Sequence, residues 1–281
     1  MKYSALDKIN LFFRTYIRMF GRIWHFSAWA SFFYLALLQL AGLILLLGIT
    51  IPGWKSIIHP ILSLFLPAPA FHFPRYLLAV PGFYTAFDNY LLGPTGWVIL
   101  SGAAVFVLGG QYFGEKPRFG DGFKLALRAY FPLLLVWLIE MVLVIIVFKI
   151  TAFLFVDLAY GSPRILLAIR VGLQLAAFLP SAFLIYAIPG IILDKRPVFK
   201  AIGNSFSLCT HSLFLTYSII LFPGLIRLVF DILIQDYSYK IVATLNPDIV
   251  VIIIILKIIV GVFINLFILG SATYLYRDLT R

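Results

Sequence analysis

The sequence predicts an all-α integral membrane protein, a six-transmembrane-helix bundle formed by a single membrane domain, 1–281. Its mean hydropathy is +1.05, with 63% hydrophobic and 12% charged residues, which is far more apolar than a soluble domain. Three stretches without Lys, Arg, Asp or Glu each exceed the roughly 20 residues that cross a bilayer core: they are 23–54, 89–114 and 171–193. No soluble core could bury this much apolar surface.

Hydropathy and the positions of the charged residues together predict the six spans. They lie at 24–50, 95–113, 129–155, 166–192, 209–232 and 250–275. The first apolar run is too long for the core of a cleaved signal peptide, so we interpret it as a retained helix. The connection 51–94 is rich in proline, and we expect short segments there that lie in the membrane interface.

The distribution of Lys and Arg predicts the orientation. The N-terminus, the loops 114–128 and 193–208 and the C-terminus together hold 14 of them, whereas the other connections hold 6. Because cytoplasmic loops carry the Lys and Arg excess, both termini are predicted to lie inside.

Three segments are candidates for an internal repeat. Each mixes basic and apolar residues at helical spacing and precedes an odd-numbered span; they are 6–13, 122–129 and 198–205. Lys8, Lys124 and Lys200 match best among them. The pattern indicates three repeats of an amphipathic elbow helix followed by two spans.

Three short motifs occupy the second half: Ile-Pro-Gly-Ile-Ile-Leu-Asp at 188–194, the Ala-x-x-x-Ser pattern from Ala201 to Ser205, and Tyr-Arg-Asp-Leu at 276–279. Over roughly the last hundred residues the chain resembles the bacterial family related to the membrane domain fused to glycerophosphodiester phosphodiesterases. The resemblance implies a six-span inner-membrane protein concerned with lipids or the envelope. Since the sequence holds no soluble phosphodiesterase domain, the resemblance implies no catalytic residue.

Glu140 is the strongest candidate for a functional polar group inside a span, because an ionisable residue at the membrane centre is costly. Asn265 is predicted at nearly the same depth, and Lys257 offers a counter-charge but lies roughly 10 Å nearer the outer face at about 1.5 Å rise per residue. Glu140 either hydrogen bonds a neighbouring helix and fixes packing, or handles ions or protons. Gln39 and Gln174 are expected to hydrogen bond between helices.

Anionic lipid headgroups are the partners that the basic elbows suit best. Arg14, Arg18 and Arg22 recur every four residues on one helical face, and Lys124 and Lys200 occupy the other two elbows. Simple positive-inside topology explains the same residues. The net charge of +11 does not indicate nucleic-acid binding, because the basic residues are spread between spans.

Enzyme chemistry finds little support in the sequence. Cys209 is the single cysteine, and there is no metal-binding, nucleophile-elbow or phosphate-loop motif, so we expect no cofactor and no metal. His59, His72 and Asp88 share the outer connection without a catalytic spacing. A polar group at the start of the fifth span is explained by a helix entry more simply than by a nucleophile paired with histidine; it comprises Ser205, Ser207, Cys209 and His211.

Two functional hypotheses follow. The first is a non-catalytic inner-membrane protein of a bacterium that acts as a membrane scaffold or in lipid or envelope homeostasis. The second is a transporter or channel for a small solute or ion, with Glu140 in the path. The second predicts a polar cavity that reaches Glu140, whereas the first predicts a dry, packed bundle.

Overall fold

The computed structural model describes residues 5–22, 26–48, 75–159, 162–244 and 248–280, together with 53, 56, 59, 60 and 246. Of this described part, 92% is helical and none is in a strand. Six helices are long and apolar enough to cross a membrane: Ser27–Leu47, Tyr76–Tyr112, Tyr130–Phe155, Arg164–Ile192, Leu213–Ile234 and Asp248–Thr280. The predicted all-α class and the number of spans are therefore confirmed.

Short helices alternate with the long ones along the chain. The first half comprises α1 (Ala5–Arg22), α2 (Phe26–Leu47), α4 (Arg75–Ala86), the π-helix η3 (Phe87–Trp97), α5 (Val98–Tyr112), α6 (Phe119–Arg128) and α7 (Tyr130–Ala159). The second half comprises α8 (Pro163–Leu184), α9 (Ala187–Ile192), α10 (Val198–His211), α11 (Leu213–Asp236), α12 (Ser238–Thr244) and α13 (Asp248–Thr280).

The second span corrects the prediction for residues 75–94 of the connection 51–94. We expected the prolines to divide this connection into short interfacial segments, but α4, η3 and α5 form one continuous helix, with Pro81 inside α4 and Pro94 inside η3. Residues 61–74 lie outside the described residues, so the expectation stays a prediction there. A proline removes one N–H group and crowds the carbonyl four residues earlier. The wider π turn around Pro94 accommodates both effects, as π adjustments do in membrane helices. The span therefore begins about twenty residues before the predicted position.

Glycines bring η3 close to its neighbours. A Cβ atom on Gly42 of α2 would lie 2.0 Å from the Phe87 ring, and one on Gly93 would lie 2.8 Å from the Trp137 ring. Both distances are shorter than any real carbon contact, so only glycine allows these approaches. The π-helix is thereby packed between α2 and α7.

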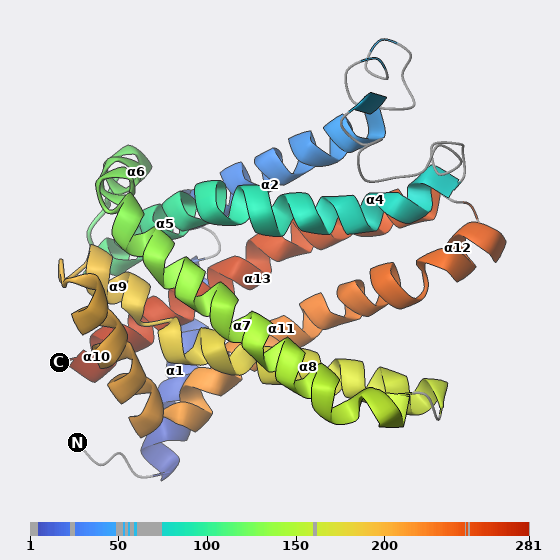
Figure 1. Ribbon diagram of the computed structural model, residues 1–281. Helices are drawn as coiled ribbons and strands as arrows, with labels where there is room; N and C mark the ends of the chain where they lie inside the picture. The colour runs from blue at the N-terminus through green and yellow to red at the C-terminus, as the bar shows by residue number, and fades with distance from the viewer. Residues whose placement is uncertain are drawn as a thin grey trace.

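The two ends of the bundle differ in shape (Figure 1). At one end, α1, α6, α9 and α10 gather around the C-terminal end of α13; we call this the elbow end, and the opposite end the far end. Towards the far end, the α7–α8 hairpin diverges from α2, α4 and α13 (Figure 1). The outer part of α7 is correspondingly exposed, with Phe153 at 82% and Leu154 at 63%.

Candidate functional site

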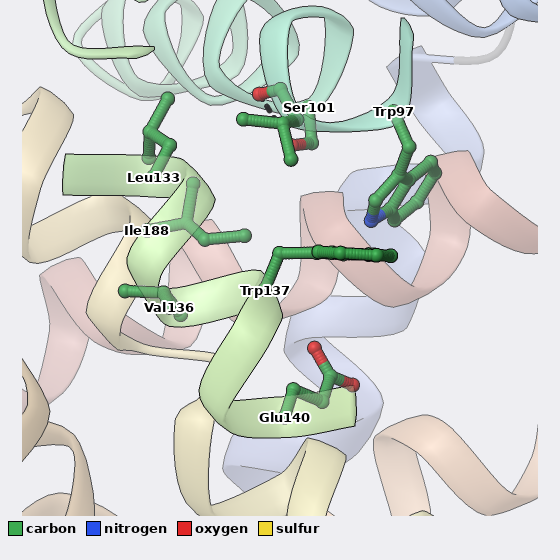
Figure 2. A pocket seen from close by; sticks show the side chains of 8 residues that line it. Trp97, Ser101, Leu133, Val136, Trp137, Glu140 and Ile188 are labelled. Atoms are coloured by element: carbon green, nitrogen blue, oxygen red, sulfur yellow. Dashed lines mark hydrogen bonds between the residues drawn. The ribbon is translucent and has the colours of Figure 1, made fainter. Parts of the chain in front are cut away.

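Glu140 lies beside a small, mostly apolar cavity (Figure 2). The cavity has a volume of about 10 Å³, room for about one water molecule. Its walls come from η3, α5, α7 and α9, and Trp137 lies between Glu140 and the side chains of Trp97 and Ser101 (Figure 2). The Ser181 hydroxyl of α8 donates a hydrogen bond of 2.5 Å to Glu140 Oε1. Glu140 thus links the two helices of the α7–α8 hairpin.

The partners expected for Glu140 lie elsewhere. Lys257 is paired with Asp231 of α11, with 2.6 Å between Nζ and Oδ1. Asn265 is half-buried in α13, and no hydrogen bond joins it to Glu140 among the described residues. Counting depth along one helix does not reveal which helices are adjacent, and Ser181 is adjacent because α8 follows α7 directly in the hairpin.

Two further polar groups lie in the far half of the bundle, and the sequence analysis identified neither. Gln39 Nε2 of α2 donates a hydrogen bond of 2.7 Å to Asp88 Oδ1 of η3. Asp231 accepts from Lys257 and lies 4.0 Å from Arg227 Nε, one helical turn away on α11. Tyr84 of α4 is also buried in this half of the bundle, at 2% exposure.

These residues form two groups: the Gln39–Asp88 pair, and Arg227 with Asp231 and Lys257. Gln39, Asp88 and Lys257 lie eight or more residues from the nearer end of their candidate spans. An ionisable side chain within a span is costly and is a functional-site hypothesis by default. The interhelical role predicted for Gln39 is confirmed, whereas Asp88 belongs to a span and not to the outer connection.

The fourth span is interrupted at Ile185 and Tyr186, between α8 and α9. Pro189 has no N–H group to offer the Ile185 carbonyl, so the helix cannot continue regularly here. The Ser205 hydroxyl of α10 bonds two other backbone groups at this interruption: it accepts from the Tyr186 N–H at 3.1 Å and donates to the Phe183 carbonyl at 2.6 Å. In many transporters a broken helix exposes backbone groups that bind substrate, but here the Tyr186 N–H and the Phe183 carbonyl are bonded by the Ser205 side chain.

This contact explains the Ala-x-x-x-Ser pattern. Ala201 and Ser205 are four residues apart on α10 and therefore share one face. Ala201 is fully buried and lies against Gly190 of α9, where a Cβ atom would approach Ala201 Cβ to 3.4 Å. The small side chain allows α10 to approach α9, and the serine then reaches the interrupted backbone.

The terminal Tyr-Arg-Asp-Leu motif forms two ionic contacts at the elbow end. Asp194 accepts a hydrogen bond from the Tyr276 hydroxyl at 2.5 Å and pairs with Arg277 at 3.0 Å and Arg196 at 3.3 Å. Asp278 accepts from the Tyr112 hydroxyl of α5 and from Arg18 of α1 at 3.5 Å. The motif therefore joins the end of α13 to α1, α5 and the turn after α9.

The predicted lipid contacts are distributed over the elbow end. Arg14 on α1, Lys124 on α6 and Lys200 on α10 are exposed. Arg18 is only partly available for a lipid headgroup, because its side chain pairs with Asp278. Arg22 belongs to α1, but its side chain lies outside the described residues.

The structure describes only some of the candidates for enzyme chemistry. His72 lies outside the described residues, and Asp88 points to Gln39. His211 Nδ1 contacts the Ser207 carbonyl one turn earlier, at 2.7 Å, as in a helix terminus. Burial raises the pKa of the Cys209 thiol to about 11, which disfavours the nucleophilic thiolate. In the part of the chain that the structure describes, no three His, Cys, Asp or Glu side chains are placed to hold a metal ion.

Comparison with known proteins adds no relative. No protein-family model, no curated protein and no solved structure matches this chain. The roles of the residues above therefore rest on their geometry.

Proposed function

We propose that this membrane protein is a non-catalytic scaffold of the bacterial inner membrane, which organises anionic lipid through three basic elbow helices on its cytoplasmic face. In this proposal α1, α6 and α10 lie in the headgroup region, and both termini are inside. Each elbow and the two spans that follow it form one of three repeats. The proposal agrees with the resemblance to the family named in the sequence analysis, since that resemblance implies a role concerned with lipids or the envelope.

The observation that carries the proposal is the two-sided exposure of α1. Its buried side presents Thr15 and Met19 to the bundle, at 1% and 0% exposure. Its opposite side exposes Phe13, Ile17 and Phe20, at 58%, 69% and 59%. Large apolar side chains so exposed beside basic residues are typical of a helix that lies in the lipid interface.

The other two elbows support the same interpretation. Phe199 is 76% exposed beside Lys200 on α10, and Leu127 is 47% exposed near Lys124 on α6. Each elbow precedes a pair of candidate spans: α1 precedes the first two, α6 the next two and α10 the last two. This order favours the threefold repeat.

The surroundings of Glu140 favour the scaffold over the transporter. The cavity there has room for about one water molecule. Ser181 donates a hydrogen bond to the Glu140 carboxyl group. Ser205 bonds the Tyr186 N–H and the Phe183 carbonyl where the fourth span is interrupted. A packed interior of this kind is what the scaffold hypothesis predicts.

The experiment compares lipid binding by two matched triple variants. Arg14→Gln, Lys124→Gln and Lys200→Gln together remove one exposed charge from each elbow; Lys149→Gln, Arg164→Gln and Lys240→Gln remove three exposed charges near the far end. The protein is reconstituted with mixed phosphatidylglycerol and phosphatidylcholine, and the lipids it retains are measured by native mass spectrometry.

Each basic residue near an anionic surface contributes about 1 kcal/mol, so the elbow variant should lose about a hundredfold in its preference for phosphatidylglycerol. The far-end variant should keep the wild-type preference. An equal loss in both variants, or no loss in either, would contradict the proposal. The orientation is tested separately with single cysteines, Arg14→Cys and Lys240→Cys, each in a Cys209→Ser background. The measurement is from which side of the membrane each cysteine can be labelled.

A further inference from the structure

We propose that Arg227, which lies beside the Asp231–Lys257 pair, binds an oxyanion: the phosphate group of an anionic lipid, or a free phosphate. The site lies on α11 and α13 in the far half of the bundle. It does not involve the three elbow helices, so the proposal does not depend on lipid binding at the elbow end.

The first argument is the balance of charge in this group. Asp231 Oδ1 accepts a hydrogen bond from Lys257 Nζ at 2.6 Å, so these two side chains form a close neutral pair. Arg227 Nε lies 4.0 Å from the other oxygen, Oδ2, which is beyond hydrogen-bonding distance. One positive charge therefore remains, and it belongs to Arg227. A single bound monoanion would make the group neutral, and uncompensated charge within a span is costly.

The second argument is that this surplus charge lies on the most exposed of the three side chains. The Arg227 side chain is 47% exposed, against 15% for Lys257 and 18% for Asp231. In the part of the chain that the structure describes, the Arg227 guanidinium donates no hydrogen bond. A guanidinium is a planar fork of N–H groups that matches two oxygens of a phosphate. Because Lys257 occupies Asp231, this fork is available to a ligand.

The third argument is the direction in which Arg227 faces. Positions four and seven residues away share its face of α11, and the side chains there are packed. Ile220 and Ile234 are 3% and 5% exposed, and Pro223 is buried. Arg227 thus lies on the face of α11 that packs against the bundle, where α11 contacts α8 and α13. Since its side chain is nevertheless 47% exposed, the packing is open at this position and the guanidinium is accessible.

Lys149 of α7 provides the contrast. Lys149 and Arg227 lie six and seven residues before the far ends of their candidate spans, and both are exposed. One turn to either side of Lys149, Ile145 and Phe153 are 46% and 82% exposed. The lysine therefore belongs to a lipid-facing side of its helix, where a long side chain snorkels to the interface. Arg227 has a buried proline one turn before it and a carboxylate one turn after it.

The contact with Asp231 indicates the direction from which the anion arrives. Asp231 is one helical turn nearer to α12, which lies at the far end of the bundle (Figure 1). The Arg227 side chain therefore extends towards that end. Seven residues separate Arg227 from the end of the span, or about 10 Å at 1.5 Å per residue. A long arginine side chain covers much of this distance, so an anion can reach it from the far interface.

The test measures the binding of two probes, phosphatidylglycerol and inorganic phosphate, to the full chain in neutral detergent. The background is the elbow variant, Arg14→Gln with Lys124→Gln and Lys200→Gln, so that the elbow residues do not contribute. Native mass spectrometry measures the retained lipid, and isothermal titration calorimetry at constant ionic strength measures phosphate binding. Arg227→Gln should weaken binding of the probe that occupies the site by about tenfold, because it removes a charge-assisted contact. Lys149→Gln should leave that binding unchanged.

Arg227→Gln keeps the Asp231–Lys257 pair, so this variant is expected to fold and to retain the unfolding curve of the background in tryptophan fluorescence. Arg227→Lys keeps the charge and loses the fork, and should weaken binding less than Arg227→Gln. A loss confined to phosphatidylglycerol identifies a lipid as the ligand, whereas a loss of phosphate binding identifies the free anion. Equal losses in Arg227→Gln and Lys149→Gln would overturn the proposal, as would the finding that neither probe binds in a way that depends on Arg227.

Discussion

Aspartates are paired with basic residues in two regions of this molecule, but the pairs have different surroundings. At the elbow end, Asp194 has three partners, Tyr276, Arg277 and Arg196, and lies where a helix ends. In the far half, Asp231 has one close partner, Lys257, and a second cation at 4.0 Å, both within candidate spans. The two carboxylates are similarly exposed, at 21% for Asp194 and 18% for Asp231, so the number of close partners distinguishes them. A carboxylate with several close partners tolerates the loss of one better than a carboxylate with a single close partner.

The largest expected effect comes from removing Lys257, the close partner of Asp231 in the far half of the bundle. Lys257→Met leaves Asp231 without its close counter-charge; because this pair is mostly buried, the loss should be about 3 kcal/mol, at the low end for buried pairs. The matched change at the elbow end, Arg277→Met, leaves Asp194 with Arg196 and Tyr276 as partners and should cost about 1 kcal/mol. Both free energies of unfolding are measured by denaturant titration in detergent, followed by tryptophan fluorescence.

The double variant Lys257→Met with Asp231→Leu is the control for this comparison. Replacing a whole buried pair by apolar residues is often neutral, so the double variant should recover most of the stability that the single variant loses. Equal costs for Lys257→Met and Arg277→Met would show that the two regions do not differ in the way their geometry indicates.

The sequence predicted the six spans because hydropathy and helix length depend only on local composition. It failed where a local rule was overruled by the surroundings. Pro81 and Pro94 argued for a broken connection, yet both lie inside one continuous helical span, where the π-helix accommodates Pro94 and close-packed glycines hold η3 against its neighbours. The error then extended to the site, since Asp88 was assigned to the outer connection together with those prolines.

The pairing of helices was also beyond the sequence. Lys257 and Glu140 were considered together because each was a charge inside a span, but the partners are set by which helices touch. One signal was available: Arg227 and Asp231 are four residues apart in the fifth span, a spacing that places both on one helical face. The sequence motifs, by contrast, correctly marked Ser205 and Tyr276 as residues with a specific place, although their contacts appeared only in the fold.

A smaller effect is expected at the interrupted fourth span, which belongs to the well-satisfied elbow end. Ser205→Ala leaves the Tyr186 N–H and the Phe183 carbonyl without their side-chain partner. A buried group left unsatisfied costs about 1–3 kcal/mol, so the loss should be about 2 kcal/mol, below that of Lys257→Met. Hydrogen exchange at the Tyr186 amide should accelerate in parallel.

Ser207→Ala is the matched control, because Ser207 lies on the same helix and is exposed. Its cost should fall within about 0.5 kcal/mol of zero, as for most surface substitutions. If Ser205→Ala were equally neutral and the Tyr186 amide stayed protected, the interruption would have another source of stabilisation. The elbow end would then be less dependent on specific contacts than we infer.

The smallest effect on stability, and the one that best reports the packing of the elbow end, concerns Cys209. Its thiol is fully buried on α10, and burial raises its pKa from the ordinary 9 to about 11. At about pH 8 the thiolate fraction is then about a hundredfold lower than for an ordinary thiol, so maleimide labelling should slow by at least that factor. Because the unfolded thiol releases its proton first, the contribution of Cys209 to stability is present below about pH 9 and is lost as the pH rises towards about 11. Labelling of the native protein at the rate of the denatured protein would mean that α10 detaches readily from the rest of the bundle.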